Sequence, residues 1–247
     1  MRIFPIALAV ALGLAACAPT TKAPTEPAQA AKVVPAYYGA RVDTGPRGEP
    51  MDIPAVRAAY LNERTMRTTV PYNGPERAGT IVVDPFARLL YYVQPGGMAE
   101  RYGVAVGTAG KNFSGTGTIA RKAAWPSWTP TANMVSSQPE LYGPLKGGMA
   151  GGKDNPLGSR ALYLYQGGRD TYYRIHGTVD PSSIGKATSA GCIRMFNQDI
   201  MDLFNRVPNG TTVHVRTQSE SNRYEGQMIE TPEGYTVPAA QMAAFAG

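Results

Sequence analysis

Short hydrophobic runs, separated by glycine and proline, occupy the stretch from Gly79 to Arg216. Runs that are rich in β-branched and aromatic side chains are typical of strands. They predict strands at residues 80–84, 89–94, 101–107, 161–166, 171–176 and 211–216. Pro95-Gly96-Gly97 and Gly167-Gly168 are turn sequences that would join neighbouring runs as hairpins. The pattern therefore predicts a mainly β domain over residues 79–216.

One segment inside this domain has helical spacing instead. Apolar side chains recur every three or four positions in residues 197–207, which predicts a helix packed against the strands. Asn197 is a candidate N-cap, and Asp199 lies in the first turn, where the helix dipole favours an acid. Pro208-Asn209-Gly210 ends the helix and leads into the last predicted strand.

The first residues have the layout of an export signal. A charged Arg2 precedes the apolar stretch Ile3 to Leu14, which is too short for a permanent transmembrane helix. Leu14-Ala15-Ala16-Cys17 resembles a bacterial lipoprotein box, in which the cysteine becomes the lipidated first residue of the mature chain. Cleavage after Ala18 is the alternative, because residues 16–18 also fit a small-x-small site.

The remaining regions are assigned from composition. Residues 1–17 are read as the signal peptide with its lipoprotein box, and residues 18–78 as a flexible tether with one short helix at 51–62. Residues 108–160 lack a clear period, which predicts a functional loop such as a lid or a substrate-binding loop. Residues 217–247 are polar and weakly patterned, and are read as a C-terminal tail.

Charge and metal-ligand counts exclude two classes of function. The net charge is +6, but acidic residues are interleaved with basic ones and no compact Lys/Arg block occurs, so nucleic acid is not an expected partner. A basic surface would suit an anionic envelope polymer, although ordinary solvation explains it equally well. Two cysteines and two histidines cannot supply a clustered zinc site, so neither a metal nor another cofactor is expected.

The scarce thiol and imidazole groups are the main chemical candidates. If Cys17 is acylated or removed, Cys192 is the one thiol of the mature chain, and a lone thiol in an exported protein is a candidate nucleophile. A thiol needs a neighbouring base such as His176, and the N–H groups of residues 190–192 could face an oxyanion. The residues alone leave open a buried structural histidine and a small buried cysteine. His214 is read as structural.

A longer pattern around these residues resembles a known family. His176-Gly177-Thr178, Ile184-Gly185 and Ser189-x-Gly191-Cys192-Ile193-Arg194-Met195 are similar to the L,D-transpeptidase (YkuD-type) catalytic domain, with the spacing of its Gram-negative members. Asn155-Pro156-Leu157-Gly158 and the segment Trp125 to Pro130 are similar to further parts of that domain. The resemblance covers residues 79–216.

This resemblance implies a β-sandwich-like fold, with one helix following the catalytic cysteine, and an acyl-transfer reaction on peptidoglycan. Cys192 would attack a donor stem peptide and expel its terminal D-residue, and His176 would take the thiol proton. The Gly177 carbonyl would orient the imidazole. Main-chain donors at Ala190 and Gly191 would bind the oxyanion, and Arg194 and Ser189 would contact the substrate.

The acceptor and the location follow as further expectations. The acceptor could be a stem peptide, an outer-membrane protein or a free D-amino acid, and lipid on Cys17 would hold the protein at a periplasmic membrane surface, that of the outer membrane. Many family members carry histidine where this chain has Ala190, which bears on acceptor choice and rate. A hydrolase of the same fold and a non-catalytic wall-binding lipoprotein are the alternatives. Sortases and papain-like peptidases differ in the spacing or the order of the histidine and cysteine.

Overall fold

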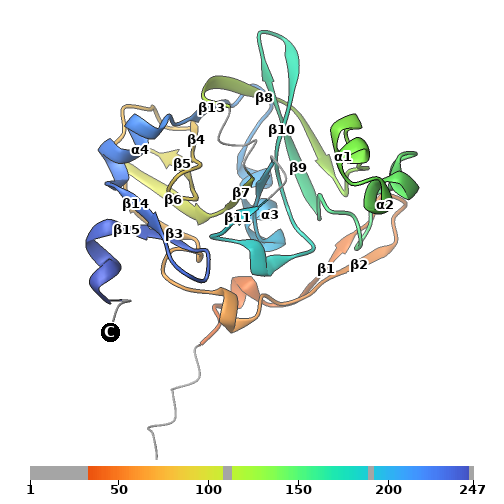
Figure 1. The fold of residues 1–247 in the computed structure, drawn as a ribbon, viewed down its shortest axis with the longest axis horizontal. Helices are drawn as coiled ribbons and strands as arrows, with labels where there is room; N and C mark the ends of the chain where they lie inside the picture. Colours follow the sequence, from red (N-terminus) through yellow and green to blue (C-terminus); the bar gives the residue numbers. More distant parts are fainter. Residues whose placement is uncertain (1–32, 108–112, 189–191, 245–247) are drawn as a thin grey trace, which may run out of the picture. The chain divides into compact units, whose positions relative to one another are not determined.

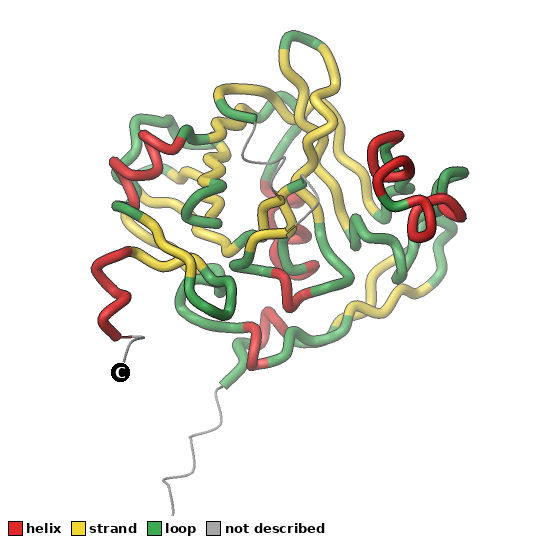
Figure 2. Tube along the Cα trace, viewed as in Figure 1, coloured by secondary structure: helices red, strands yellow, loops and turns green. Residues whose placement is uncertain are grey.

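The computed structural model describes residues 33–107, 113–188 and 192–244. Its strands in the main sheet are β3 Thr68–Pro71, β4 Ile81–Asp84, β5 Leu89–Gln94, β6 Met98–Gly103, β7 Ala105–Gly107, β8 Gly115–Ala124, β9 Arg160–Gln166, β10 Arg169–His176, β11 Ala187–Thr188, β12 Ile193–Arg194 and β13 Thr212–Val215. Within the described ranges they form one mixed sheet of 11 strands in the order β11-β7-β12-β10-β9-β8-β13-β4-β5-β6-β3. Strands make up more of the described chain than helices do (Figure 2). The prediction of a mainly β domain is confirmed.

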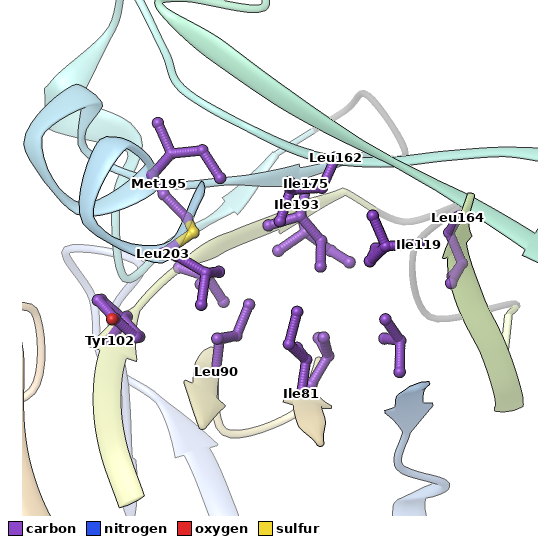
Figure 3. Packing of buried hydrophobic residues seen from close by; sticks show 14 of the residues in the cluster. Ile81, Leu90, Tyr102, Ile119, Leu162, Leu164, Ile175, Ile193, Met195 and Leu203 are labelled. Carbon is purple, nitrogen blue, oxygen red and sulfur yellow. The ribbon is translucent and has the colours of Figure 1, made fainter. Parts of the chain in front are cut away.

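The core lies between two stretches of this sheet. Ile81 of β4 and Leu90 of β5 face Leu162 of β9, Ile175 of β10 and Ile193 of β12 across an apolar core (Figure 3). All of these side chains are at most 3% exposed. Burial of each large aliphatic side chain stabilises the fold by roughly 1.5–3 kcal/mol before the entropy cost of folding is counted. Because side chains alternate along a strand, the neighbours of these core residues point to the opposite face of the sheet.

The predicted helix is present as α3, Asn197–Arg206, and its Leu203 packs into the same core. Its N-cap is Phe196 rather than Asn197. The Asn197 amide instead accepts a hydrogen bond from the Ser159 backbone N–H and donates one to the Thr178 carbonyl, each 2.9 Å long. The helix start therefore cross-links two loops instead of capping itself.

Besides α3, the described residues contain α-helices that the sequence pattern did not predict. The segment read as one long loop contains β8 and two short helices, α1 Ala132–Ser137 and α2 Pro139–Tyr142. A further helix, α4 Gln218–Glu225 (Figure 1), follows the last strand of the main sheet. It begins with a capping box between Thr217 and Glu220. That Thr-x-x-Glu pattern is visible in the sequence and was the available signal for α4. In the described ranges, no helix is long and apolar enough to cross a membrane.

The reading of residues 18–78 as a flexible tether is wrong for the described part, residues 33–78. This N-terminal arm forms the hairpin β1 Arg41–Thr44 with β2 Pro50–Ile53, two short 3-10 helices, and strand β3. Residues 51–62 contain β2 and the 3-10 helix Ala58–Tyr60 instead of the expected α-helix. The arm is ordered because Tyr38 is fully buried against Phe196, with ring centroids 5.5 Å apart.

The reading of residues 217–247 as a tail is also wrong, as far as residue 244. After α4, the chain forms the hairpin β14 Met228–Glu230 with β15 Thr236–Pro238, followed by a 3-10 helix. Leu89 and Tyr91 lie on the outer face of β5, and Met228 packs against their cluster. The outer face of β4 to β6 is apolar, and the C-terminal segment orders because it covers part of that face.

Candidate functional site

The register of two parallel strands brings the predicted site residues together. Ile175 of β10 lies beside Ile193 of β12, and His176 lies beside Arg194. Both isoleucines are in the core, and side chains alternate along a strand, so His176 and Arg194 point from the opposite face. Cys192 immediately precedes Ile193 and therefore shares that face. A histidine, a cysteine and an arginine thus lie on one face of the sheet at the ends of neighbouring strands.

Hydrogen bonding determines the tautomer of His176. Its ring lies 2.6 Å from the Gly177 carbonyl oxygen through Nδ1. A carbonyl only accepts, so Nδ1 donates and carries the proton, which leaves the lone pair on Nε2. His176 is 3% exposed, and this burial lowers its pKa to about 4. The Arg194 and Arg174 charges act in the same direction, and hydrogen bonds with the Gly177 and Leu157 backbones oppose it. The imidazole is therefore a neutral base at pH 7.

Cys192 is a half-buried thiol with no disulfide partner among the described residues. Burial raises its pKa above the ordinary thiol value, against the opposing effects of a hydrogen bond from the Arg174 backbone and the charges of Arg174 and Arg194. The resting site therefore holds a neutral thiol and a neutral imidazole. A thiolate stabilised by imidazolium is disfavoured at rest because neither charge is adequately solvated.

Two glycines beside His176 lie too close to Asn197 to carry a side chain. A Cβ on Gly177 would lie 2.1 Å from Asn197 Oδ1, and Gly158 has a φ of +63° with the same oxygen 2.4 Å from its Cβ position. Both positions therefore require glycine. Asn197 binds Ser159 and Thr178, so it holds the loop that carries the Gly177 carbonyl. Sequence reasoning missed this role because a capping asparagine and a loop-bridging one look alike in the sequence.

Arg174 is a second residue that sequence reasoning missed. Its guanidinium is paired twice with Asp170, at 2.7 Å and 2.8 Å, and its backbone bonds to Cys192. The available signal was its spacing, because Arg174 and His176 are two residues apart on one predicted strand and so share a face. Arg194 differs in that no described carboxylate pairs with its half-buried side chain, which leaves its charge available to a ligand.

Several predicted positions lie outside the described residues. These are Cys17 of the predicted lipoprotein box and Ser189, Ala190 and Gly191, which precede Cys192. A cavity of about 310 Å³ lies behind the His176 loop, lined among others by Pro54, Trp125 and Thr178, and it does not include Cys192 or His176. Within the described ranges, no cluster of three or more His, Cys, Asp or Glu residues could hold a metal ion.

Residues 78–215 match the family model described as the L,D-transpeptidase catalytic domain, YkuD, which covers more than half of the chain. The chain belongs to this family. The matched range contains His176, Cys192 and Arg194 together with Arg174 and Asn197. It also ends before α4 and the C-terminal hairpin and begins after β3, so both packed extensions lie outside the family's common domain.

Named relatives agree with the family. The chain is 36% identical over 155 residues to the Escherichia coli protein named Probable L,D-transpeptidase YbiS, covering 59% of this chain and 49% of that protein. It is 37% identical over 144 residues to Probable L,D-transpeptidase ErfK/SrfK of the same species, covering 58% and 45%. The chain thus spans about half the length of these relatives.

A solved structure is also similar in sequence. A Brucella melitensis protein described as a probable carnitine operon oxidoreductase is 50% identical, with a TM-score of 0.45, and the match covers 62% of this chain and 94% of that one. A TM-score below 0.5 does not bear on the fold or the function of this chain.

Proposed function

We propose that this chain is an exported peptidoglycan L,D-transpeptidase that forms an acyl-enzyme on Cys192 and transfers the acyl group to an amine. The observation that carries the proposal is the β10–β12 register, because it gives Cys192 and His176 the same face of the sheet. The fixed Nδ1 proton of His176 supports it further, since Nε2 is then the nitrogen that can accept a proton.

Acylation begins from the neutral pair. The Cys192 Sγ attacks the carbonyl carbon of the donor as its proton passes to His176 Nε2, and main-chain N–H groups at residues 190–192 bind the oxyanion. Collapse of the tetrahedral adduct breaks the amide bond, and the imidazolium returns the proton to the departing amine. A pKa of about 4 makes this imidazolium a strong acid, so leaving-group protonation is favourable.

Deacylation repeats these steps with the acceptor. The acceptor amine attacks the thioester while His176 Nε2 takes one of its protons, and the Cys192 thiolate leaves and regains that proton. Arg194, beside His176 in the register, would bind a carboxylate of either substrate. Stem peptides, an outer-membrane protein or a free D-amino acid would each supply the required amine.

Mass spectrometry of the products tests the reaction. Purified protein is incubated with disaccharide-tetrapeptide fragments of peptidoglycan, and cross-linked dimers lacking one terminal D-residue are the expected product. Cys192→Ala should form none while it keeps the fold. Shortened monomers without cross-links would instead identify a hydrolase, and unchanged fragments would favour a wall-binding lipoprotein.

The cellular location is a separate part of the proposal. The apolar N-terminal stretch and the box ending at Cys17 support export and lipidation, with the catalytic domain in the periplasm at the outer membrane. The native protein should partition with membranes, and Cys17→Ser should release it or leave it unprocessed. A soluble wild-type protein beginning at Pro19 would contradict lipidation in favour of ordinary cleavage.

A further inference from the structure

A row of two arginines and a tyrosine extends across the sheet from the nucleophile. The backbone of Arg174 bonds to Cys192, Arg174 on β10 pairs with Tyr163 on β9, and Tyr163 pairs with Arg121 on β8. The preceding residue, Leu162, is in the core, so Tyr163 and its two neighbours lie on the same face as Cys192.

The tyrosine ring holds both guanidinium groups. The Cζ atoms of Arg121 and Arg174 lie 4.1 Å and 4.4 Å from the Tyr163 ring centroid, which is the geometry of a cation–π contact. Arg121 and Arg174 come from the strands on either side of β9, so Tyr163 lies between them in the row. The side chain of Arg121 is therefore partly oriented before any ligand arrives.

The two arginines differ in what their N–H groups contact. Arg174 is paired with Asp170, at 2.7 Å and 2.8 Å, and its side chain is 14% exposed, so its donors are already occupied. Arg121 is exposed, and no carboxylate in the described ranges pairs with it. A planar guanidinium with free donors binds a carboxylate through two parallel hydrogen bonds.

The span of the row matches a short peptide. Three strand spacings separate the backbone at Cys192 from that at Arg121, which is about 14 Å, or about four residues of extended chain. The side chains of Cys192 and Arg121 shorten the distance that the peptide must bridge where they lean toward each other over the row. A carboxylate on a residue roughly one to three positions before the one that carries the reacting carbonyl is therefore within reach of Arg121 while that carbonyl is at the thiol.

We propose that Arg121, held against Tyr163, binds a carboxylate of the donor stem peptide on the amino-terminal side of the scissile bond, and so makes the enzyme select donors that carry this carboxylate free. The inference rests on the proposed function and specifies its substrate. Arg121 is a specificity-determining residue in this account, and Tyr163 is its positioning residue.

The test compares two synthetic tetrapeptide donors. One carries a free carboxylate on the second residue, and the other carries a carboxamide there. Arg121→Gln should reduce kcat/KM for the carboxylate donor about tenfold or more through KM, with kcat nearly unchanged, and should leave the carboxamide donor unaffected. Arg121→Lys should restore part of the loss, because it restores the charge without the planar donor pair.

Two controls separate recognition from folding. Arg223→Gln removes an exposed arginine from α4 and should change neither donor's kinetics. Tyr163→Phe keeps the ring and should behave as wild type, whereas Tyr163→Leu should raise KM for the carboxylate donor alone. An equal loss of kcat/KM for both donors in Arg121→Gln would overturn the proposal. So would a variant whose melting temperature falls while its kinetics stay unchanged, because the row would then be a structural contact only.

Binding measurements keep this inference separate from the transpeptidase proposal. Calorimetry with the Cys192→Ala protein should give tighter binding of the carboxylate donor than of the carboxamide donor, and the added Arg121→Gln change should abolish that difference. Equal affinities would overturn the role of Arg121 even if wild-type enzyme turns over. If the wild-type enzyme shows no turnover but the expected difference in donor affinity is found, the proposed reaction is contradicted and the carboxylate site at Arg121 still stands.

Discussion

At the scale of single residues, the surroundings of the thiol and imidazole decide their protonation. His176 is buried with one nitrogen committed to the Gly177 carbonyl, and its pKa of about 4 keeps it neutral. Burial shifts the pKa of Cys192 in the other direction, upward, because the charges of Arg174 and Arg194 do not offset the loss of solvent. Both shifts favour the neutral form. We therefore propose that the proton is transferred during attack on the substrate rather than before the substrate binds.

Alkylation of the free enzyme tests this protonation state. The rate of reaction of Cys192 with iodoacetamide should rise with pH and inflect above the ordinary thiol pKa of about 8.5, because burial disfavours the thiolate. The unfolded protein, as control, should inflect at the ordinary value. An inflection below pH 7 in the folded protein would mean that a thiolate–imidazolium pair exists at rest.

At the scale of elements, the C-terminal hairpin supports the segment that leads into the nucleophile. Arg88, 3% exposed, donates to the carbonyls of Gly185 and Gly234 and forms a 2.8 Å ion pair with Glu230 of β14. Lys186 and Tyr235 form a further backbone bridge. These contacts hold Gly185 and Lys186, which precede Cys192 by a few residues in the chain.

Loss of the Arg88 partner should therefore weaken both stability and catalysis. Glu230→Gln should lower the free energy of unfolding by roughly 1–2 kcal/mol, less than for a fully buried pair, because Glu230 is 53% exposed and screened by water. It should also lower kcat more than it raises KM. Urea unfolding and steady-state kinetics measure these effects, with exposed Glu233→Gln as the matched control. Identical kinetics in both variants would mean that the hairpin does not affect the site.

At the scale of the whole molecule, the N-terminal arm joins the domain through a buried polar contact. Tyr38 donates a 3.0 Å hydrogen bond to Asp199, which is fully buried in the first turn of α3. Burial raises the pKa of Asp199 to about 8, against the opposing charge of Arg67. The folded state thus binds a proton that the unfolded state releases near pH 4, so this group makes stability fall as pH rises from about 4 to about 8.

Asp199→Asn isolates that contribution. The amide stays neutral and can still accept from Tyr38, so the variant should lose less stability than wild type between pH 6 and pH 8. Melting temperatures across that range measure the difference, and Asp154→Asn at an exposed position is the control. A wild-type curve parallel to that of the Asn variant would mean that Asp199 is already ionised throughout this range.

Local sequence pattern predicted most of the strands of the main sheet and α3, but not the structure of the N-terminal arm or of the segment after residue 216. The strands and α3 follow from residues that are neighbours in the chain, and the candidate residues His176 and Cys192 come from a motif with fixed spacing. The arm was missed because its anchor is long-range, with 161 positions between Tyr38 and Asp199. The Arg121–Tyr163–Arg174 row depends on the pairing of three strands, and the thiol pKa depends on burial, so neither could be inferred from a single segment.

The central claim is that Cys192 carries the acyl group. Intact-protein mass spectrometry after rapid mixing with a tetrapeptide donor, without an acceptor, tests it most directly. The account predicts one adduct with the mass of the donor less its terminal D-residue, mapped to the peptide that contains Cys192 and absent from Cys192→Ala and His176→Ala. An adduct on another residue, or cross-linked product formed by the Cys192→Ala protein, would contradict the account.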